Sequence, residues 1–409
     1  MARDYCTMDD FNFKGKTVLL RSEFNSPIGK DGKITDDKRI RESVPTIEAL
    51  KDAKVAILAH QGRPGKKDFT TLEQHAKHLQ KYLNREVRYV DSIFSTEARR
   101  AVQDMKPGDV ILLENVRFYS EEQLEKPPEE QAKTIMVKKL APLFDIFLND
   151  AFGASHRSHD SMVGFDPVLP SGAGKLMAKE IDALTQATTG GPAVYVLGGA
   201  KVDDSVEVTK SVLEKKLASK VLVTGAVANA FLAASGVDIG RPSMEYLENN
   251  KYLGEIDAAE GILNKFNGKV VLPVDVAINK DGKREDISVK SLPTNHMIAD
   301  IGKETIAKFS DIIGHADKVI INGPAGIFEN PDFRIGTDAI LKAATKAKFS
   351  VIGGGHSTEA VDQLNISDKI SHVSTGGGAA IDFLSGKPMP AIEALKAAKA
   401  RVKEMARTR

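Results

Sequence analysis

The sequence has little of several features that assign a protein to a class at once. Its 409 residues include one cysteine, Cys6, so the chain cannot form an internal disulfide, and a reducing cytosol fits. Residues 1–16 contain no apolar run, which argues against a signal peptide. No other run approaches the roughly 18–20 apolar residues of a membrane span. We therefore expect a cytoplasmic protein with no membrane partner.

An excess of charge of one sign is lacking as well. The 57 Lys and Arg residues balance the 56 Asp and Glu residues, and the net charge is +1. Such a chain has no overall field to attract nucleic acid or anionic lipid, so we expect neither as a partner. The length favours two or three domains. The oligomeric state stays open between a monomer and a small homo-oligomer.

What the sequence does have is a regular alternation of short apolar segments and helical ones. Nearly continuous Val, Ile and Leu runs, which are typical of strands covered on both faces, occur in both halves. Examples are 17–24, 55–60, 109–115, 193–199, 220–225, 269–278 and 318–324. The alternation predicts an α/β fold with two doubly wound, parallel-sheet (Rossmann-like) domains.

The domain boundary is expected near residues 175–192. "KLMAKEIDALTQAT" reads as a helix, and the breaker "TGGP" follows it. We expect a first domain over 1–177, a hinge helix over 178–190 and a second domain over 191–388. The basic segment 389–409 carries an apolar stripe at helical spacing, which predicts a helix docked on the body of the protein.

Arginine and histidine follow the predicted strands of the first half. Ligands of doubly wound sheets bind beyond the carboxyl ends of the strands, so these residues are expected to converge. Any one of them alone is more often a surface charge or a satisfied histidine. Together they indicate a small, highly charged anion, because arginine forks recognise carboxylate and phosphate. They are Arg21, Glu23, Asn25, Arg39, His60, Arg63, Arg117, His156, Arg157 and His159.

Glycine-rich loops follow the predicted strands of the second half. Each alone could be a tight turn, but five at one sheet edge favour nucleotide phosphates held by backbone N–H groups. The loops are 197–205, 223–229, 321–329, 351–358 and 374–380. The chain has neither a Walker motif nor GxGxxG. Lys201 is the best candidate for a cation that reaches a transferring phosphate.

An anion-binding half and a nucleotide-binding half across a hinge fit phosphoryl transfer, with closure to exclude water. A dinucleotide-dependent dehydrogenase would need GxGxxG after the first strand, which instead ends in "RSEFNSP". A two-lobed anion-binding protein without enzymatic activity would not need a glycine-rich second half.

The motifs, in order along the chain, resemble those of the phosphoglycerate kinase family. They are "LLRSEFN", "HQGRPG", "ILLENVRF", "NDAFGASHRSHDSMVG", "LGGAKV", "LPVD", "NGPAGIFE", "IGGGHS" and "SHVSTGGGA". The resemblance implies reversible phosphoryl transfer between 1,3-bisphosphoglycerate and ADP, giving 3-phosphoglycerate and ATP. It also implies two α/β domains with a hinge helix, and a C-terminal tail that returns to the first domain.

The resemblance also implies roles for individual residues. Arg39 and Lys201 would be catalytic, by neutralising charge on the transferring group. Binding of 3-phosphoglycerate would fall to Glu23, Asn25, Arg39, His60, Gln61, Gly62, Arg63, Arg117 and Arg157. The nucleotide would contact Lys201, Gly225, Asn322, Glu329, Gly354, Gly355, His356 and Ser357. Mg²⁺ would come with ATP or ADP, bound mainly through the nucleotide.

Three positions depart from the common pattern of the family. Glu23 stands where aspartate is usual, and Ser205 stands where many members carry a second lysine. His356 stands where an aspartate usually helps to hold Mg²⁺, and "GGGHS" resembles the archaeal branch. Magnesium prefers oxygen ligands. Either Asp203 or Asp204 therefore supplies a carboxylate ligand, or the ion binds through the nucleotide. We expect His356 to donate a hydrogen bond to a phosphate.

Overall fold

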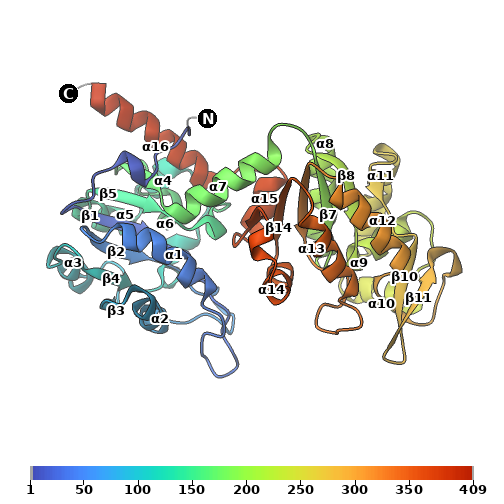
Figure 1. Ribbon diagram of the computed structural model, residues 1–409. Helices are drawn as coiled ribbons and strands as arrows, with labels where there is room; N and C mark the ends of the chain where they lie inside the picture. Colours follow the sequence, from blue (N-terminus) through green and yellow to red (C-terminus); the bar gives the residue numbers. More distant parts are fainter. Residues whose placement is uncertain (1–2, 408–409) are drawn as a thin grey trace. The chain divides into compact units, whose positions relative to one another are not determined.

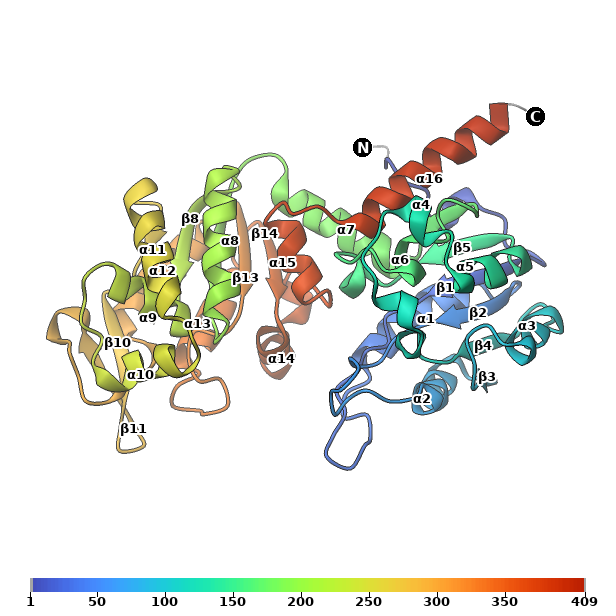
Figure 2. The ribbon, with the colours of Figure 1, turned by 180° about the vertical axis from the view of Figure 1, so that it is seen from behind.

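The computed structural model describes residues 3–407, with side chains over 3–401 (Figures 1 and 2). The chain divides into two compact units. Unit 1 extends to Ile181 and includes the segment that begins at Pro388, and unit 2 covers Asp182–Lys387. No helix of the described part is both long enough and apolar enough to cross a membrane.

The core of unit 1 is a six-stranded parallel sheet in the order β3-β4-β2-β1-β5-β6. Its strands are almost wholly buried, which explains their unbroken runs of Val, Ile and Leu. The strands are β1 Thr17–Arg21, β2 Lys54–Leu58, β3 Val87–Val90, β4 Val110–Leu113, β5 Ile146–Asn149 and β6 Ser171–Ala173. The sequence did not predict β6, because its three residues, Ser-Gly-Ala, carry no β signal.

Helices cover both faces of this sheet. Apolar side chains of α1 and α2 pack with Val18, Leu20 and Val55 on one face. Those of α3 and α5 pack with Leu19 and Ala56 on the other. The helices are α1 Lys38–Ala49, α2 Glu73–Leu83, α3 Thr96–Gln103, α4 Pro128–Gln131, α5 Ile135–Leu140 and α6 Asp160–Val163. The 3-10 turns are η1 Met8–Asp10, η2 Val116–Phe118, η3 Ser120–Gln123, η4 Ala141–Leu143 and η5 Phe152–Ala154.

Two long helices concern the ends of unit 1. Helix α7, Lys175–Thr188, begins in unit 1 and ends in unit 2, and it covers residues 178–188 of the segment 178–190 that we expect to act as a hinge. Helix α16, Pro390–Arg407, lies against β6 and α6. Its Ile392, Leu395 and Ala398 are buried. The apolar stripe expected in this segment continues to Val402 and Met405, but the structure does not describe their side chains.

Unit 2 has its own six-stranded parallel sheet, in the order β15-β14-β13-β7-β8-β9. Its strands are β7 Ala193–Leu197, β8 Ala218–Val223, β9 Val270–Val271, β13 Lys318–Asn322, β14 Phe349–Gly353 and β15 His372–Val373. Its helices are α8 Val202–Glu214, α9 Gly225–Ala234, α10 Arg241–Asn249, α11 Leu253–Lys265, α12 Lys303–Gly314, α13 Ile335–Ala344, α14 Gly355–Gln363 and α15 Gly378–Leu384. The expected fold class of two parallel-sheet α/β domains is confirmed.

A small antiparallel sheet, β11-β10-β12, was not predicted. Its strands are β10 Asp275–Lys280, β11 Lys283–Ser288 and β12 Met297–Ile301, and the 3-10 turns η6 Val289–Ser291 and η7 Ser367–Lys369 complete the unit. The single strand expected over 269–278 is wrong. Pro273 interrupts it, because proline has no N–H for a strand ladder. Strand β9 pairs with β8, and β10 joins the second sheet.

Candidate active site

A buried arginine organises the carboxyl end of β1. The Arg21 side chain is fully enclosed, and its Nη2 lies 2.9 Å from Nδ1 of His60. A guanidinium can only donate, so Nδ1 of His60 accepts and the ring proton sits on Nε2. Burial, followed by the nearby Arg21 and Arg117, lowers the pKa of His60 well below its usual value. His60 is therefore a neutral hydrogen-bond donor at physiological pH.

One carboxylate behind Arg21, that of Glu122, supplies the opposite charge. Arg21 Nε donates to Oγ of Ser161 at 2.9 Å, and that hydroxyl donates to Glu122 at 2.6 Å. The Ser161 amide donates to the other oxygen of Glu122 at 2.9 Å. Burial and the neighbouring Glu122 raise the pKa of Asp160 to about 10. Asp160 is thus protonated at neutral pH, and Glu122 carries the charge that faces Arg21.

Glu23, Asn25 and Arg39 form one cluster near the carboxyl end of β1. Arg39 Nη1 lies 3.3 Å from Oε1 of Glu23 and donates to the carbonyl of Asn25 at 2.9 Å. The second carboxylate oxygen of Glu23, Oε2, is buried and has no hydrogen-bond partner among the described residues. A buried acceptor without a partner is rare in a folded protein and points to a donor supplied by a ligand.

The loop after β2 is shaped by Gly62. Its φ is +67°, and a Cβ there would lie 2.5 Å from the backbone oxygen of Asp68, so only glycine fits. Its N–H donates to Oδ1 of Asn25 at 2.9 Å, and its carbonyl accepts from Arg117. Gly62 thus joins two of the residues expected to bind the anion.

The side chain of Gln61, one of the residues expected to bind the substrate, is buried within the loop after β2. It is 0% exposed, and Oε1 accepts from the Ser26 amide at 2.8 Å and faces Nε2 of His75 at 2.9 Å. Its Nε2 donates to the carbonyls of Ser26 and Asp68 at 2.9 and 3.1 Å. The Gln61 side chain therefore holds the loop in place and has no polar atom left for a ligand.

The remaining arginines lie close enough together to perturb one another. Burial, Arg157 and Arg21 lower the pKa of Arg117 to about 10. Burial and Arg63 lower the pKa of Arg157. Such mutual lowering means that the guanidinium groups repel each other and favour the binding of an anion among them.

Three glycine-containing loops meet at the carboxyl ends of the unit 2 strands. The Gly225 amide donates to the carbonyl of Ala325 at 2.9 Å, and the Gly199 amide donates to that of Pro324 at 2.8 Å. Gly225 has φ +61°, and a Cβ there would lie 2.8 Å from the backbone nitrogen of Gly199. Close approach of these backbones needs glycine, as the sequence suggested.

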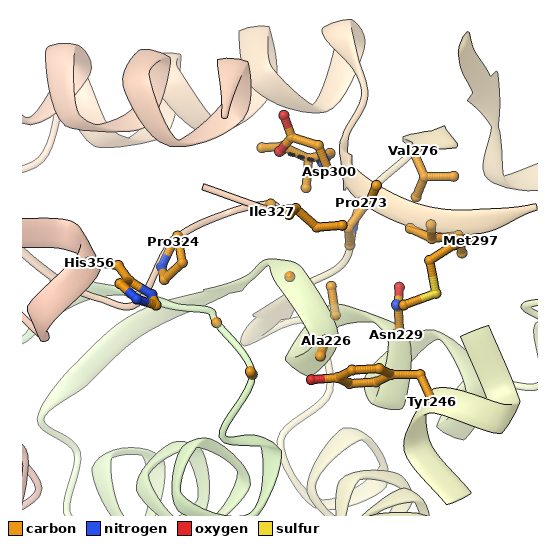
Figure 3. A pocket seen from close by; sticks show the side chains of 18 of the residues that line it. Ala226, Asn229, Tyr246, Pro273, Val276, Met297, Asp300, Pro324, Ile327 and His356 are labelled. Atoms are coloured by element: carbon orange, nitrogen blue, oxygen red, sulfur yellow. Dashed lines mark hydrogen bonds between the residues drawn. The ribbon is translucent and has the colours of Figure 1, made fainter. Parts of the chain in front are cut away.

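A largely apolar pocket of about 200 Å³ opens beside these loops. Figure 3 shows Tyr246 and Ala226 on one side of it and Pro324 and His356 on another. Flat apolar walls with a few polar atoms suit an aromatic ligand such as a nucleobase. The other lining residues are Gly199, Ala200, Gly225, Ala228, Asn229, Pro273, Val276, Met297, Ile298, Ala299, Asp300, Ile301, Gly326, Ile327 and Glu329.

The glycine loop after β14 starts helix α14. Gly354, with φ +87°, is the residue before the helix, and Gly355, His356 and Ser357 form its first turn. The hydroxyl of Ser357 is buried and lacks a hydrogen-bond partner within the described part of the chain. Asn322, at the end of β13, has its Oδ1 next to Gly354. The N-terminus of a helix with a free hydroxyl is suited to an anion.

His356 lies at the edge of both features. Its Nε2 is 3.7 Å from Oε1 of Glu329, and its ring stacks on Phe328 with centroids 5.8 Å apart. The Arg334 guanidinium lies over the Phe328 ring at 4.7 Å. His356 and Glu329 are both more than half exposed, so a ligand could reach them.

Lys201 immediately precedes α8 and is exposed, with Asp203 and Asp204 exposed in the first turn. Ser205 is buried, 4% exposed. Over the described residues, no group of three His, Cys, Asp or Glu side chains could hold a metal ion. Mg²⁺ keeps its waters and binds readily through phosphates.

Several residues were not predicted for the site. Arg21 was only noted at a strand end, and its partners Glu122 and Ser161 were not singled out. Tyr246, which lines the pocket, comes from α10, a helix without a glycine loop or a charge pattern. No local signal could have identified it, because only the packing of α10 brings it to the pocket, whereas Asn229 lies at the end of the predicted glycine-containing segment 223–229.

The chemistry that such sites can support is the transfer of a phosphoryl group from one anion to another, so the protein is a phosphotransferase. A family model described as "Phosphoglycerate kinase" matches residues 8–387. The chain belongs to that family.

Relatives and a solved structure agree over almost the whole length. The chain is 53% identical to the phosphoglycerate kinase of Methanosarcina mazei, over 97% of this chain and 96% of that protein. It is 51% identical to the phosphoglycerate kinase of Archaeoglobus fulgidus, over 95% and 96%. The crystal structure of phosphoglycerate kinase from Pyrococcus horikoshii OT3 matches with a TM-score of 0.90 and 42% identity, covering 97% of this chain and 99% of that one.

The expected resemblance to archaeal-type phosphoglycerate kinase is confirmed. The protein is an enzyme, a phosphotransferase with a carboxyl group as acceptor. It catalyses the reversible transfer between 1,3-bisphosphoglycerate and ADP, giving 3-phosphoglycerate and ATP, and so acts in glycolysis.

Proposed function

We propose that unit 1 binds 3-phosphoglycerate among its arginines. The observation that carries this proposal is the group formed by Glu23 after β1, neutral His60 after the neighbouring β2, and Arg39 at the start of α1, with Oε2 of Glu23 buried and unpaired among the described residues. That oxygen would accept from the substrate hydroxyl, and His60 Nε2–H would donate to an anionic oxygen. The phosphate and carboxylate would be neutralised by Arg39, Arg63, Arg117 and Arg157, with Asn25 and Gly62 fixing the loop.

Unit 2 would bind ADP or ATP. The apolar pocket would take the adenine, beside Gly225 and Ala226, and Glu329 would face the ribose. The phosphates would lie at the start of α14, held by the Gly354–Gly355 backbone, the Ser357 hydroxyl and His356, with Asn322 supporting the loop. Lys201, which is exposed, would extend to the transferred group.

Catalysis by these residues would be electrostatic. In the direction of ATP use the nucleophile is the carboxylate of 3-phosphoglycerate, with a pKa of roughly 4. It is ionised at pH 7, so no general base is required. Arg39 and Lys201 would stabilise the charge of the transferring phosphoryl group. Closure about the hinge segment in α7 stays a prediction of this mechanism.

Mg²⁺ would enter as part of the nucleotide substrate. His356 is a poor ligand for this hard cation, and Asp203 and Asp204 are exposed carboxylates at the start of α8. We also propose a cytoplasmic location, since a chain with one cysteine, Cys6, cannot form an internal disulfide and needs no oxidising compartment. A monomer or a small homo-oligomer fits the proposal equally, and neither nucleic acid nor membrane is needed.

Arg39→Met tests the proposed role of the cluster. We expect kcat for ATP formation from ADP and 1,3-bisphosphoglycerate to fall by roughly 100-fold or more, the range of a lost transition-state cation. Arg41→Met is the matched control. It lies on the same helix, is half exposed and pairs only with Asp37 in the described part, at 3.1 Å. Near-normal turnover of Arg39→Met with an intact fold would remove Arg39 from the catalytic set.

A further inference from the structure

Unit 1 has a cavity of about 310 Å³ that none of the residues proposed for the reaction lines. It lies between α3 and the segment formed by α5 and η4. Its lining contains four cationic side chains and no acidic one. The lining residues are Thr96, Arg99, Arg100, Gln103, Lys138, Lys139, Pro142 and Leu143.

This cavity is separate from the substrate site. Thr96, Arg99, Arg100 and Gln103 share one face of α3, at i, i+3, i+4 and i+7. Helices α3 and α5 pack on the same face of the sheet, and Figures 1 and 2 show α3 beside β3 and β4. The residues proposed to bind 3-phosphoglycerate lie instead in loops after β1, β2, β4 and β5 and at the start of α1.

The four cations have no counter-charge in contact. None of them forms an ion pair within the described residues. Lys138 also acts on Glu121, whose pKa is lowered first by the Tyr119 hydroxyl and last by Lys138. Four like charges around one cavity repel each other, which costs free energy unless an anion enters.

Arg99, which lines the cavity, has one N–H group without a partner in the described structure. Its Nη2 donates to Oγ1 of Thr96 at 3.3 Å, which fixes the guanidinium against α3. Its Nε is buried and has no partner among the described residues. A half-buried guanidinium with one unused N–H is prepared to bind an anionic oxygen.

We infer that this cavity is a binding site for a small polyanion with two or more linked phosphate groups. Its volume is about ten times the roughly 30 Å³ that a water molecule occupies in the liquid, which leaves room for a short phosphate chain. Arg99 and Arg100 on one wall and Lys138 and Lys139 on the other place positive charge on both sides. An anion with one phosphate group would neutralise only part of that charge.

Calorimetric titration with tripolyphosphate tests the inference. The full-length enzyme is first saturated with 3-phosphoglycerate and ADP, so that the catalytic sites are occupied. We expect one further site in the wild type. The double variant Arg99→Gln/Lys138→Gln should bind at least tenfold more weakly, while its kcat stays within twofold of the wild type. The control Lys51→Gln/Lys81→Gln removes the same charge from exposed positions outside the cavity and should bind like the wild type.

Hydrogen exchange locates the ligand independently. Tripolyphosphate should slow amide exchange in peptides covering α3 and in those covering α5 and η4. Equal weakening in both double variants would mean attraction by general charge only, and would overturn the inference. So would unchanged binding in Arg99→Gln/Lys138→Gln, or the absence of any further site. Loss of turnover in that variant would show that the cavity is not separate from catalysis.

Discussion

Arg21 illustrates how a residue far from solvent can set the protonation state of His60, which we propose to contact the substrate. A buried guanidinium is costly unless it is paired and hydrogen-bonded. Here Ser161 and Glu122 meet that requirement on one side, and His60 accepts on the other. The result is a histidine with a fixed tautomer and no charge. Residue type alone indicated an anion site, but it could not show which of these side chains contacts a ligand and which supports another residue.

A buried carboxyl predicts a pH-dependent stability. Burial raises the pKa of Asp150 to about 7. Because this exceeds the unfolded value near 3.9, the folded chain holds the proton more tightly. The stability from the protonated group is fully present below about pH 4 and is lost as the pH rises to about 7.

Asp150→Asn should therefore become relatively more stable as the pH rises. We compare the free energy of unfolding of the wild type with that of the variant. The difference, wild type minus variant, should fall by about 1.4 kcal/mol per pH unit between pH 4 and 7 and level off at higher pH. Urea unfolding at several pH values measures it. Asp52→Asn, at an exposed turn, should show no such trend. A constant difference for Asp150→Asn would contradict the raised pKa.

The unpaired hydroxyl of Ser357 gives a second prediction at this scale. Ser357→Ala should weaken ADP binding by roughly tenfold, because a hydrogen bond to a charged group contributes about 1.5–3 kcal/mol. The ligand-free protein should lose no stability, since the hydroxyl has no partner in the described structure. Calorimetry with ADP and thermal unfolding separate the two effects. The control is Thr345→Ala, whose hydroxyl bonds only within its own helix end. Unchanged ADP affinity would exclude the phosphate contact.

At the scale of elements, loops at the carboxyl ends of the strands carry the function and the strands carry the core. The runs of Val, Ile and Leu located most strands, because strands buried on both faces are apolar throughout. The runs failed for β6, which is held by its pairing with β5 rather than by apolar side chains. The apolar runs also failed at Pro273, because the chain leaves the parallel sheet after β9 and joins the antiparallel sheet at β10. Pairing is a tertiary property, and sequence periodicity does not record it.

The loop after β2 predicts a clear difference between two glycines. Gly62→Ala would place a Cβ 2.5 Å from backbone at a φ of +67°, whereas Gly65 has φ +78° with nothing within 4 Å. We expect Gly65→Ala to cost about 1 kcal/mol for its backbone conformation alone. Gly62→Ala should cost more and raise KM for 3-phosphoglycerate several-fold, since Asn25 and Arg117 bond to this residue. Urea unfolding and steady-state kinetics measure both. Equal effects of the two substitutions would contradict the steric argument.

At the scale of the whole molecule, the last helix completes the first unit. Helix α16 follows unit 2 in sequence, yet its Ala391 and Ala394 pack with Ala151, Met162 and Val163 of unit 1. The stability of unit 1 therefore depends on the chain being complete to this helix. Its apolar stripe predicted docking, but not the surface that receives it.

Leu395→Ala tests that dependence. Leu395 is 0% exposed, and its truncation should destabilise unit 1 by about 2–5 kcal/mol. Hydrogen exchange should quicken in β5, β6 and α6 and stay unchanged in the unit 2 strands. Glu393→Ala, an exposed position on the same helix, serves as the control. Uniform loosening of both units, or none, would contradict a role confined to unit 1.

The sequence by itself determined the fold class, the family and the kinds of side chain at each strand end. These follow from local periodicity and from ordered motifs, which are properties of short segments. Only the tertiary structure decided that Gln61 supports a loop, that Arg21 sets the state of His60 and that Glu23 and Ser357 keep unpaired atoms. It also decided which helices enclose the apolar pocket of unit 2 and the cationic cavity of unit 1. The reason is physical: hydrogen-bond partners, burial and mutual charge depend on residues far apart in the chain, which meet only when the sheets and helices pack.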